Sequence, residues 1–157
     1  MTDAADTTAI RAHLEAVLTE ERALVFPSFT AADALRLGDI LYALATERAL
    51  SVELDIRRNA QVAFHAAFPG TTPENADWIR RKVNVVHRHE TSSLAFRLRC
   101  DLGGAPIWLD RIEFAPAGGC IPVKLAGGEI VGTVTVSGLK DVDDHALVVE
   151  AMQAFLE

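Results

Sequence analysis

The chain has 157 residues, of which 50% are hydrophobic and 24% charged, and its formal net charge is -7. This length and composition are typical of one globular domain. The acidic balance argues against nucleic-acid binding, because phosphate contacts require a basic surface. No stretch approaches the apolar length of a membrane span, and there is no signal-peptide or paired-cysteine pattern. We therefore expect a cytoplasmic protein with a single domain over residues 1–157.

The first third of the chain predicts two helices separated by a short strand. Residues 7–22 carry apolar side chains at helical spacing, so residues 1–22 are treated as an N-terminal helical extension. A short apolar strand ends at Pro27. The next helix is predicted from Thr30 as its N-cap, with Asp33 at its third position, where a carboxylate suits the helix dipole.

A hairpin is predicted over residues 51–68, where the hydrophobic period changes to two. A three-residue loop, Arg58-Asn59-Ala60, would place Ile56 opposite Val62 and keep one face apolar. The same register would place Glu53 across from His65 on the polar face.

The rest of the chain predicts a helix, a second helix, another hairpin and a last helix. The count of about five strands and five helices, joined by hairpins, predicts an α+β fold with an antiparallel sheet covered by helices. The first of the helices in this part of the chain is predicted to begin with Thr72 as N-cap and Pro73 at its first position, and the second to begin at Thr91 or Ser92 and end at Gly103-Gly104. The strands of the hairpin are predicted at 120–125 and 130–136. Asp141 is the predicted cap of the last helix.

The most basic stretch, WIRRKVNVVHRH at 78–89, is the first candidate site. Arg81 and Lys82 could bind a carboxylate or phosphate; the alternative is a solvated helix face or salt bridges between subunits. His87 and His89 are two apart and would not face each other on a helix, so no metal site is predicted.

Two further polar groups allow two interpretations each. Asp55, Arg57 and His65 could form an acid–base face, or pair across strands as in ordinary sheets. Ser92 and Ser93 could receive an anion at a helix N-terminus, or simply cap that helix. Cys120 is expected to be a buried, inert thiol.

Several motifs resemble the haem-degrading-domain family, the GlcG- and HbpS-like proteins. The segment AGGCIPVKLAGGEIVGTVTVSG carries a GG-x-[hydrophobic]-P start at Gly118, Gly119 and Pro122. Within that family the chain is similar to a cytosolic subfamily. The shared motifs are DIRRN at 55–59, FPGTTPEN at 68–75, WIRRK followed by NVV within 78–86, and the pair Ser92-Ser93.

The resemblance implies a profilin-like α+β fold, with an antiparallel five-stranded sheet flanked by helices, and homo-oligomers built on dimers. It also makes haem the candidate cofactor. The subfamily usually has a histidine where this chain has Ala117, so any ligand or acid–base role of that histidine is absent here. The expected ligand-binding residues are Asp55, Arg57, His65, Arg81, Lys82, Ser92, Ser93, Gly118, Gly119 and Pro122.

Three functions stay open at this point. The first is a small-ligand-binding protein, for haem or a related anionic cofactor, with its pocket between the glycine-rich hairpin and the helix bearing Arg81 and Lys82. The second is a non-enzymatic oligomeric interaction protein whose motifs are buried between subunits. The third is an enzyme, ranked last because no nucleophile and base occur together in one motif, so catalytic residues stay unassigned.

Overall fold

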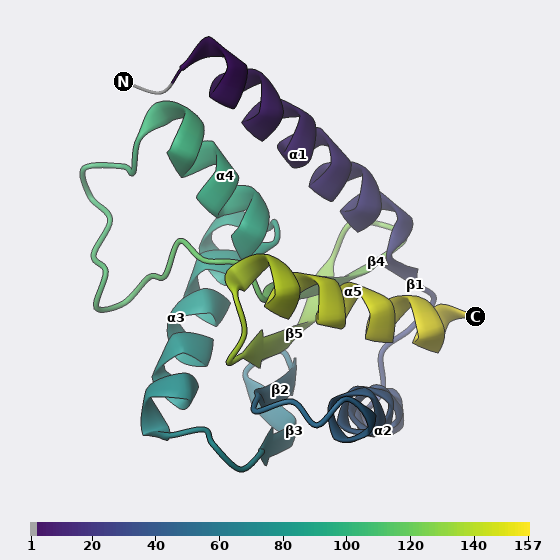
Figure 1. Cartoon of the computed structure of the whole chain (residues 1–157). Helices are drawn as coiled ribbons and strands as arrows, with labels where there is room; N and C mark the ends of the chain where they lie inside the picture. The colour runs from purple at the N-terminus through teal and green to yellow at the C-terminus, as the bar shows by residue number, and fades with distance from the viewer. Residues whose placement is uncertain (1–2) are drawn as a thin grey trace.

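The helices and strands begin and end close to the local sequence signals. The computed structural model describes residues 3–157 (Figure 1). In chain order the elements are α1 (Ala4–Ala23), β1 (Val25–Phe26), α2 (Ala31–Glu47), β2 (Glu53–Arg58), β3 (Gln61–Ala67), α3 (Pro73–His89), α4 (Ser93–Gly103), β4 (Cys120–Leu125), β5 (Ile130–Ser137) and α5 (Asp141–Leu156).

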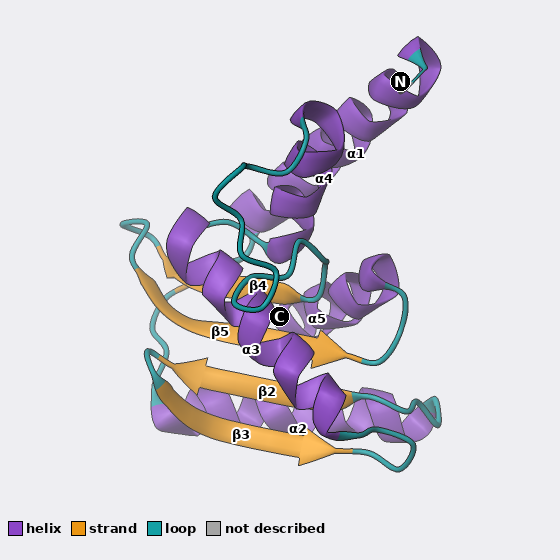
Figure 2. Cartoon of the chain, turned by 90° about the vertical axis from the view of Figure 1, so that its left-hand side faces the viewer, coloured by secondary structure: helices purple, strands orange, loops and turns teal. Residues whose placement is uncertain are grey.

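The strands form one sheet in the order β1-β4-β5-β2-β3 (Figure 2). Neighbouring strands run antiparallel, except that β1 is parallel to β4, with Val25 opposite Lys124. The expected α+β fold with five strands flanked by helices is confirmed. The sheet is mixed instead of wholly antiparallel, because the chain enters β1 from the end of α1 and runs in the same direction as β4.

Helices cover both faces of the sheet. On one face α2 and α5 pack over an apolar core in which Leu37, Leu41, Leu54 and Ile56 are fully buried. On the other face α3 crosses the sheet, while α1 and α4 pack side by side and extend past its edge (Figure 2). None of the helices in residues 3–157 combines the length and apolar character that a bilayer span requires.

The expected register of the β2–β3 hairpin is wrong. Ile56 pairs with Phe64, and the turn is Asn59-Ala60 instead of a three-residue loop. An irregularity after Ile56 shifts the register by one residue, so the tight turn and the apolar face are both retained. Asn59 has a φ of 51°, a left-handed conformation that asparagine tolerates in tight turns.

Side chains cap the N-termini of α2, α3 and α4 as the sequence predicts. Thr30 and Asp33 form a reciprocal capping box on α2, and Ser92 caps α4 by accepting the backbone N–H of Ala95 at 3.1 Å. The expectation that Asp141 caps α5 is wrong, because Lys140 precedes the helix and offers no side-chain cap. The Asp141 carboxylate instead accepts hydrogen bonds from Gly118 and Arg97.

Gly119 stands where the chain enters β4 beside β5. Its φ is 129°, in the region that favours glycine, and a Cβ there would lie 2.5 Å from the carbonyl oxygen of Val136. The Gly119 carbonyl accepts the backbone N–H of Val136 at 2.9 Å, so the backbones are already in contact. This position therefore excludes any side chain.

We expect Gly119→Ala to lower the free energy of unfolding by about 2–3 kcal/mol, because the substitution adds backbone strain and a steric clash. Gly103→Ala is the matched control. That glycine ends α4, and a Cβ there would meet no atom within 4 Å, so alanine should be neutral or stabilise by up to about 1 kcal/mol. Urea denaturation of both variants measures the difference, and equal stabilities would contradict the close packing at Gly119.

Candidate ligand site at Lys82

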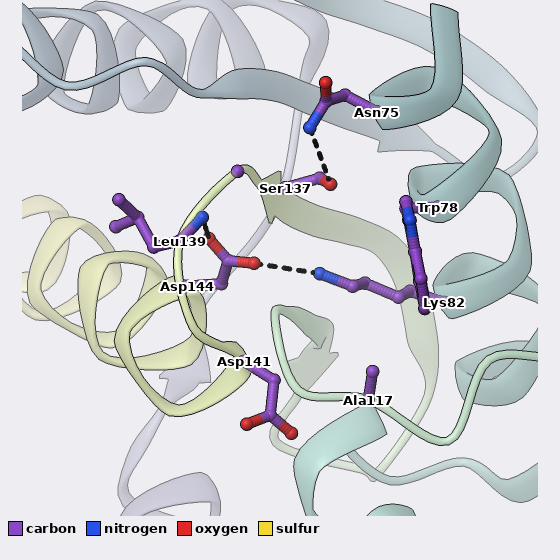
Figure 3. A pocket seen from close by; sticks show the side chains of 9 residues that line it. Asn75, Trp78, Lys82, Ala117, Ser137, Leu139, Asp141 and Asp144 are labelled. Atoms are coloured by element: carbon purple, nitrogen blue, oxygen red, sulfur yellow. Dashed lines mark hydrogen bonds and ion pairs between the residues drawn. The ribbon is translucent and has the colours of Figure 1, made fainter. Parts of the chain in front are cut away.

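A cleft opens where the first half of α3 faces the end of β5 and the start of α5 (Figure 3). Its volume is about 370 Å³, within the usual range for small-molecule sites. We call it the Lys82 cleft; its lining includes Asn75, Trp78, Lys82, Ala117, Ser137 and Asp144.

Lys82 reaches across this cleft from α3 to α5 (Figure 3). Its Nζ donates to Asp144 Oδ2 and to the carbonyl oxygen of Val136, each at 3.0 Å. The side chains of Lys82 and Asp144 are both only 3% exposed, which makes this a buried ion pair. An ammonium has three donors, and these two contacts use two of them.

The carboxylate of Asp144 is held on both oxygens. Its Oδ1 accepts the backbone N–H of Leu139 at 2.9 Å, while Oδ2 accepts from Lys82. Burial raises the pKa of Asp144 above its ordinary value, against the opposing effects of the Lys82 charge and the backbone donors. The cleft therefore has a neutralised pair at its base, not a free positive charge.

Trp78 gives the Lys82 cleft a flat aromatic wall, and Asn75 contributes a side-chain amide. The Asn75 amide donates to Ser137 Oγ at 3.4 Å across the mouth of the cleft (Figure 3). Arg81, an expected ligand residue, is not among the lining side chains. Its guanidinium stacks on the Trp78 ring at 4.1 Å and its Nε donates to Asp77 at 2.8 Å, so Arg81 supports Trp78.

Gly119 packs against the Lys82 side chain, whereas Gly118 packs against Leu94 and the backbone of Asp141, and neither glycine is among the lining residues of the cleft. A Cβ at Gly119 would lie 2.7 Å from Lys82 Nζ. The Gly118 N–H donates to Asp141 Oδ2 at 3.1 Å. Burial alone would raise the pKa of Asp141, but this N–H and the Arg97 guanidinium hold it below its ordinary value. Gly119 thus lets the backbone approach the ion pair closely.

Ser92, Ser93 and Pro122 lie outside the lining of the Lys82 cleft. Ser92 caps α4, and Ser93 Oγ accepts the backbone N–H of Cys120 at 3.0 Å. Pro122 is buried within β4, opposite Thr133. Cys120 is fully buried, and burial raises its thiol pKa to about 12, as suits an unreactive thiol.

Asp55, Arg57 and His65 form a separate network on β2 and β3. His65 places Nδ1 3.0 Å from Asp55 Oδ2 and Nε2 2.8 Å from Glu53 Oε1, and Arg57 Nε donates to Asp55 at 2.8 Å. The expected contact between Glu53 and His65 is present, although Asp55 is the residue directly opposite His65. A carboxylate on each ring nitrogen favours the imidazolium form of His65 and leaves neither nitrogen free for acid–base chemistry.

No group of three or more histidine, cysteine, aspartate or glutamate side chains within residues 3–157 is arranged to hold a metal ion. Asn75, Trp78 and Asp144 are site residues that the sequence reasoning missed. Asn75 and Trp78 belong to the matched FPGTTPEN and WIRRK motifs, and that was the available signal. Nothing in the sequence connected Asp144 with Lys82.

The His65 network makes stability depend on pH. Burial alone would lower the pKa of His65, but hydrogen bonds to Asp55 and Glu53 raise it above 6.5. A raised folded-state pKa stabilises the fold fully below the unfolded value, and that contribution is lost as pH rises through the folded value. The difference in unfolding free energy between wild type and His65→Gln should therefore shrink as pH increases above about 6.5.

Urea denaturation in steps from mildly acidic to alkaline pH would measure this difference. His13→Gln, which removes an exposed imidazole from α1, is the control for losing a histidine. A difference for His65→Gln that grows with rising pH would mean that the ring is not held as the imidazolium.

Known proteins similar to this chain support one family. The model of the family described as haem degrading protein HbpS-like matches residues 29–153. A UPF0303 protein of Streptomyces avermitilis is 45% identical over 141 residues, covering 87% of this chain and 86% of the relative. A UPF0303 protein of Burkholderia lata is 44% identical over 147 residues, covering 91% and 89%.

Solved structures share the fold. The Ybr137w protein superposes with a TM-score of 0.82 at 26% identity, covering 99% of this chain and 96% of its own. HbpS gives a TM-score of 0.66 at 20% identity, with coverage of 82% and 90%. A PduOC:heme complex gives 0.68 at 15% identity, with coverage of 81% and 94%. The chain therefore belongs to the HbpS-like family.

Proposed function

We propose that this chain is a cytoplasmic small-ligand-binding protein whose site is the Lys82 cleft. The observation that carries the proposal is the buried pair of Lys82 and Asp144 at the base of an open cleft. A buried ion pair is seldom an economical way to stabilise a fold, since apolar residues often serve equally well. This pair lies at the base of a cleft and leaves one of the three N–H donors of Lys82 without a partner among the described residues, which suits the binding of a ligand.

The charges indicate which ligand fits. Lys82 is neutralised by Asp144, and the nearby Asp141 is neutralised by Arg97 at 3.0 Å. The cleft therefore favours an uncharged oxygen acceptor for Lys82, such as an amide or carbonyl, over the strongly anionic ligand expected from the basic stretch. Trp78 offers a flat surface for an apolar or aromatic portion of the same molecule.

Haem iron does not fit the Lys82 cleft. The usual protein ligands of haem iron are histidine, cysteine, methionine and tyrosine side chains, none of which lines this cleft, and the amine of Lys82 is paired with Asp144. Its residues suit a smaller organic molecule held by hydrogen bonds.

The class of ligand can be tested with three matched probes: benzamide, benzoate and benzylamine. In a Trp108→Phe background Trp78 is the sole tryptophan, so its fluorescence reports on the cleft. We expect benzamide to bind most tightly, benzoate less so, and benzylamine, which has no oxygen acceptor, not measurably. Failure of benzamide and benzoate to bind, or equal binding of benzylamine, would contradict this proposal.

The variants must separate binding from folding. Lys82→Met alone leaves a buried carboxylate unpaired and should cost about 3–5 kcal/mol. Adding Asp144→Asn removes that charge while its oxygen can still accept the Leu139 N–H, so the double variant should recover much of the stability but lose benzamide binding. Lys140→Met, which removes an exposed lysine, should bind like the parent.

Haem is a second candidate ligand, supported by the family description and by one exposed side chain. His87 lies on α3 outside the Lys82 cleft, and its ring makes no hydrogen bond within the described residues. Partial burial of the ring, followed by the charge of Arg57, lowers the pKa of His87 below its ordinary value, which favours the neutral imidazole. A neutral imidazole is the form that ligates metals. Bound haem would supply redox chemistry at its iron.

Hemin titration tests this second site independently of the first. His87→Ala should abolish a hemin-induced Soret shift, whereas His13→Ala, which removes another exposed histidine, should not. A shift that survives His87→Ala, or no shift in the wild type, would overturn the assignment to His87.

Self-association is part of the same proposal, as the family resemblance implies. It is supported by apolar side chains exposed in the segment between α4 and β4. Ile107 is fully exposed, and Trp108 and Ile112 are 42% and 74% exposed. Such a group of apolar side chains suits a contact with another protein surface.

A further inference from the structure

A second cleft lies at the opposite end of α3 from the Lys82 cleft and shares no lining residue with it. It is formed by the end of α1, the strand β1, the C-cap of α3, one residue of α4, and the turn between β4 and β5. Its volume is about 370 Å³. We call it the Glu21 cleft, after the buried carboxylate in its wall.

Three basic side chains that form no ion pair within residues 3–157 line the Glu21 cleft: Arg22, Arg99 and Lys124. They come from α1, α4 and β4, so the fold brings together cations that are distant in sequence. The carboxylates in the lining are Glu21 and Glu90. In a chain with a net charge of -7, this local excess of positive charge is unusual. Arginines elsewhere are commonly paired with carboxylates, as for Arg36, Arg48, Arg57, Arg80, Arg81 and Arg97.

The buried side chain of Glu21 is a second, independent indication that this cleft binds a ligand. It is only 9% exposed, and its Oε1 accepts the backbone N–H of Ser92 at 2.8 Å. Its Oε2 is buried and has no hydrogen-bond partner within the described part of the chain. A buried carboxylate oxygen without a donor is costly, and such atoms in folded proteins call for a specific explanation. A ligand that brings a positively charged donor would supply the missing partner.

The remaining surface of the Glu21 cleft is largely apolar. Leu18, Leu24, Val25, Leu125 and Ala126 line it. Val25 is 44% exposed on the edge strand of the sheet, although it is a large apolar side chain. Apolar contact is therefore available beside the two kinds of charge.

We propose that the Glu21 cleft binds an apolar α-amino acid in its zwitterionic form. The ammonium group pairs with the free oxygen of Glu21. The carboxylate lies among Arg22, Arg99 and Lys124, where charge-assisted hydrogen bonds are strong. The aliphatic side chain packs on the apolar wall, and the volume of the cleft lies within the range of small-molecule sites.

Calorimetric titration of the full chain with three matched probes tests each part of the ligand. L-leucine carries the ammonium, the carboxylate and the side chain; 4-methylpentanoate lacks the amine, and 3-methylbutylamine lacks the carboxylate. We expect L-leucine to bind at least about ten-fold more tightly than either analogue, since each loses a charge-assisted contact. Absence of L-leucine binding, or equal binding of 4-methylpentanoate, would overturn the proposal.

Single substitutions test which charged side chain contacts which part of the ligand. Arg99→Gln and Lys124→Gln should each weaken L-leucine binding by about ten-fold, and Arg11→Gln, an exposed arginine elsewhere on α1, should not. Glu21→Gln can still accept the Ser92 N–H but loses the negative charge, so L-leucine should bind no better than 4-methylpentanoate. If Glu21→Gln keeps the full preference for L-leucine, the ammonium site is wrong.

This test is independent of the proposed function. The double variant Lys82→Met with Asp144→Asn should lose benzamide binding and keep L-leucine binding. Loss of both would contradict two separate sites, whereas loss of benzamide binding alone supports them.

Discussion

The buried pair of Lys82 and Asp144 is the interaction on which the arrangement of this end of the molecule depends. It joins α3 on one face of the sheet to the first turn of α5, and its third member is the carbonyl oxygen of Val136 in β5. Because both side chains are almost fully buried, neither can be removed alone without leaving a charge in an apolar setting. Gly119 is required for the same reason, since any side chain there would occupy the space of the ammonium.

Buried charged side chains on the α3-facing side of the sheet have the same requirement as Lys82 and Asp144, since each needs a partner of opposite charge. The strand β2, which lies between β5 and the edge strand β3, buries apolar residues toward α2 and carboxylates toward α3, where Asp55 is 1% exposed and Glu53 is 5% exposed. These carboxylates are tolerated because Arg57 and His65 supply positive partners. The α3-facing side of the sheet therefore includes buried carboxylates that need positively charged partners, while the opposite side packs aliphatic and phenylalanine side chains.

Local signals predicted most of the fold. The capping box at Thr30, the proline at the start of α3 and the cap at Ser92 each depend on neighbours within a few residues, and all three are present. The hairpin register failed because the alternating pattern is equally satisfied by two registers that keep Ile56 on the apolar face. Only the bulge and the left-handed Asn59 select between them.

The site was harder to predict because its contacts are distant in sequence. The helical pattern placed Lys82 on the same side as Trp78 and Val85 and Arg81 on another side, but both residues were expected to bind the ligand. The structure separates them: Lys82 faces Asp144, which is 62 residues away, and Arg81 stacks outside on Trp78. The anionic ligand expected from a run of basic residues loses its support once Lys82 is paired. Spacing within one helix cannot reveal a partner contributed by another.

The start of α4 lies between the two clefts and explains why they are expected to act separately. Ser92 donates its backbone N–H to Glu21, and the hydroxyl of Ser93 accepts the N–H of Cys120, next to Gly119. Both serines are fully buried, and their hydrogen bonds anchor the helix end to α1 on one side and β4 on the other. Coupling between distant sites requires an element with two alternative arrangements. Buried hydrogen bonds on both sides hold this helix end in place, so we expect each cleft to respond to its own ligand alone.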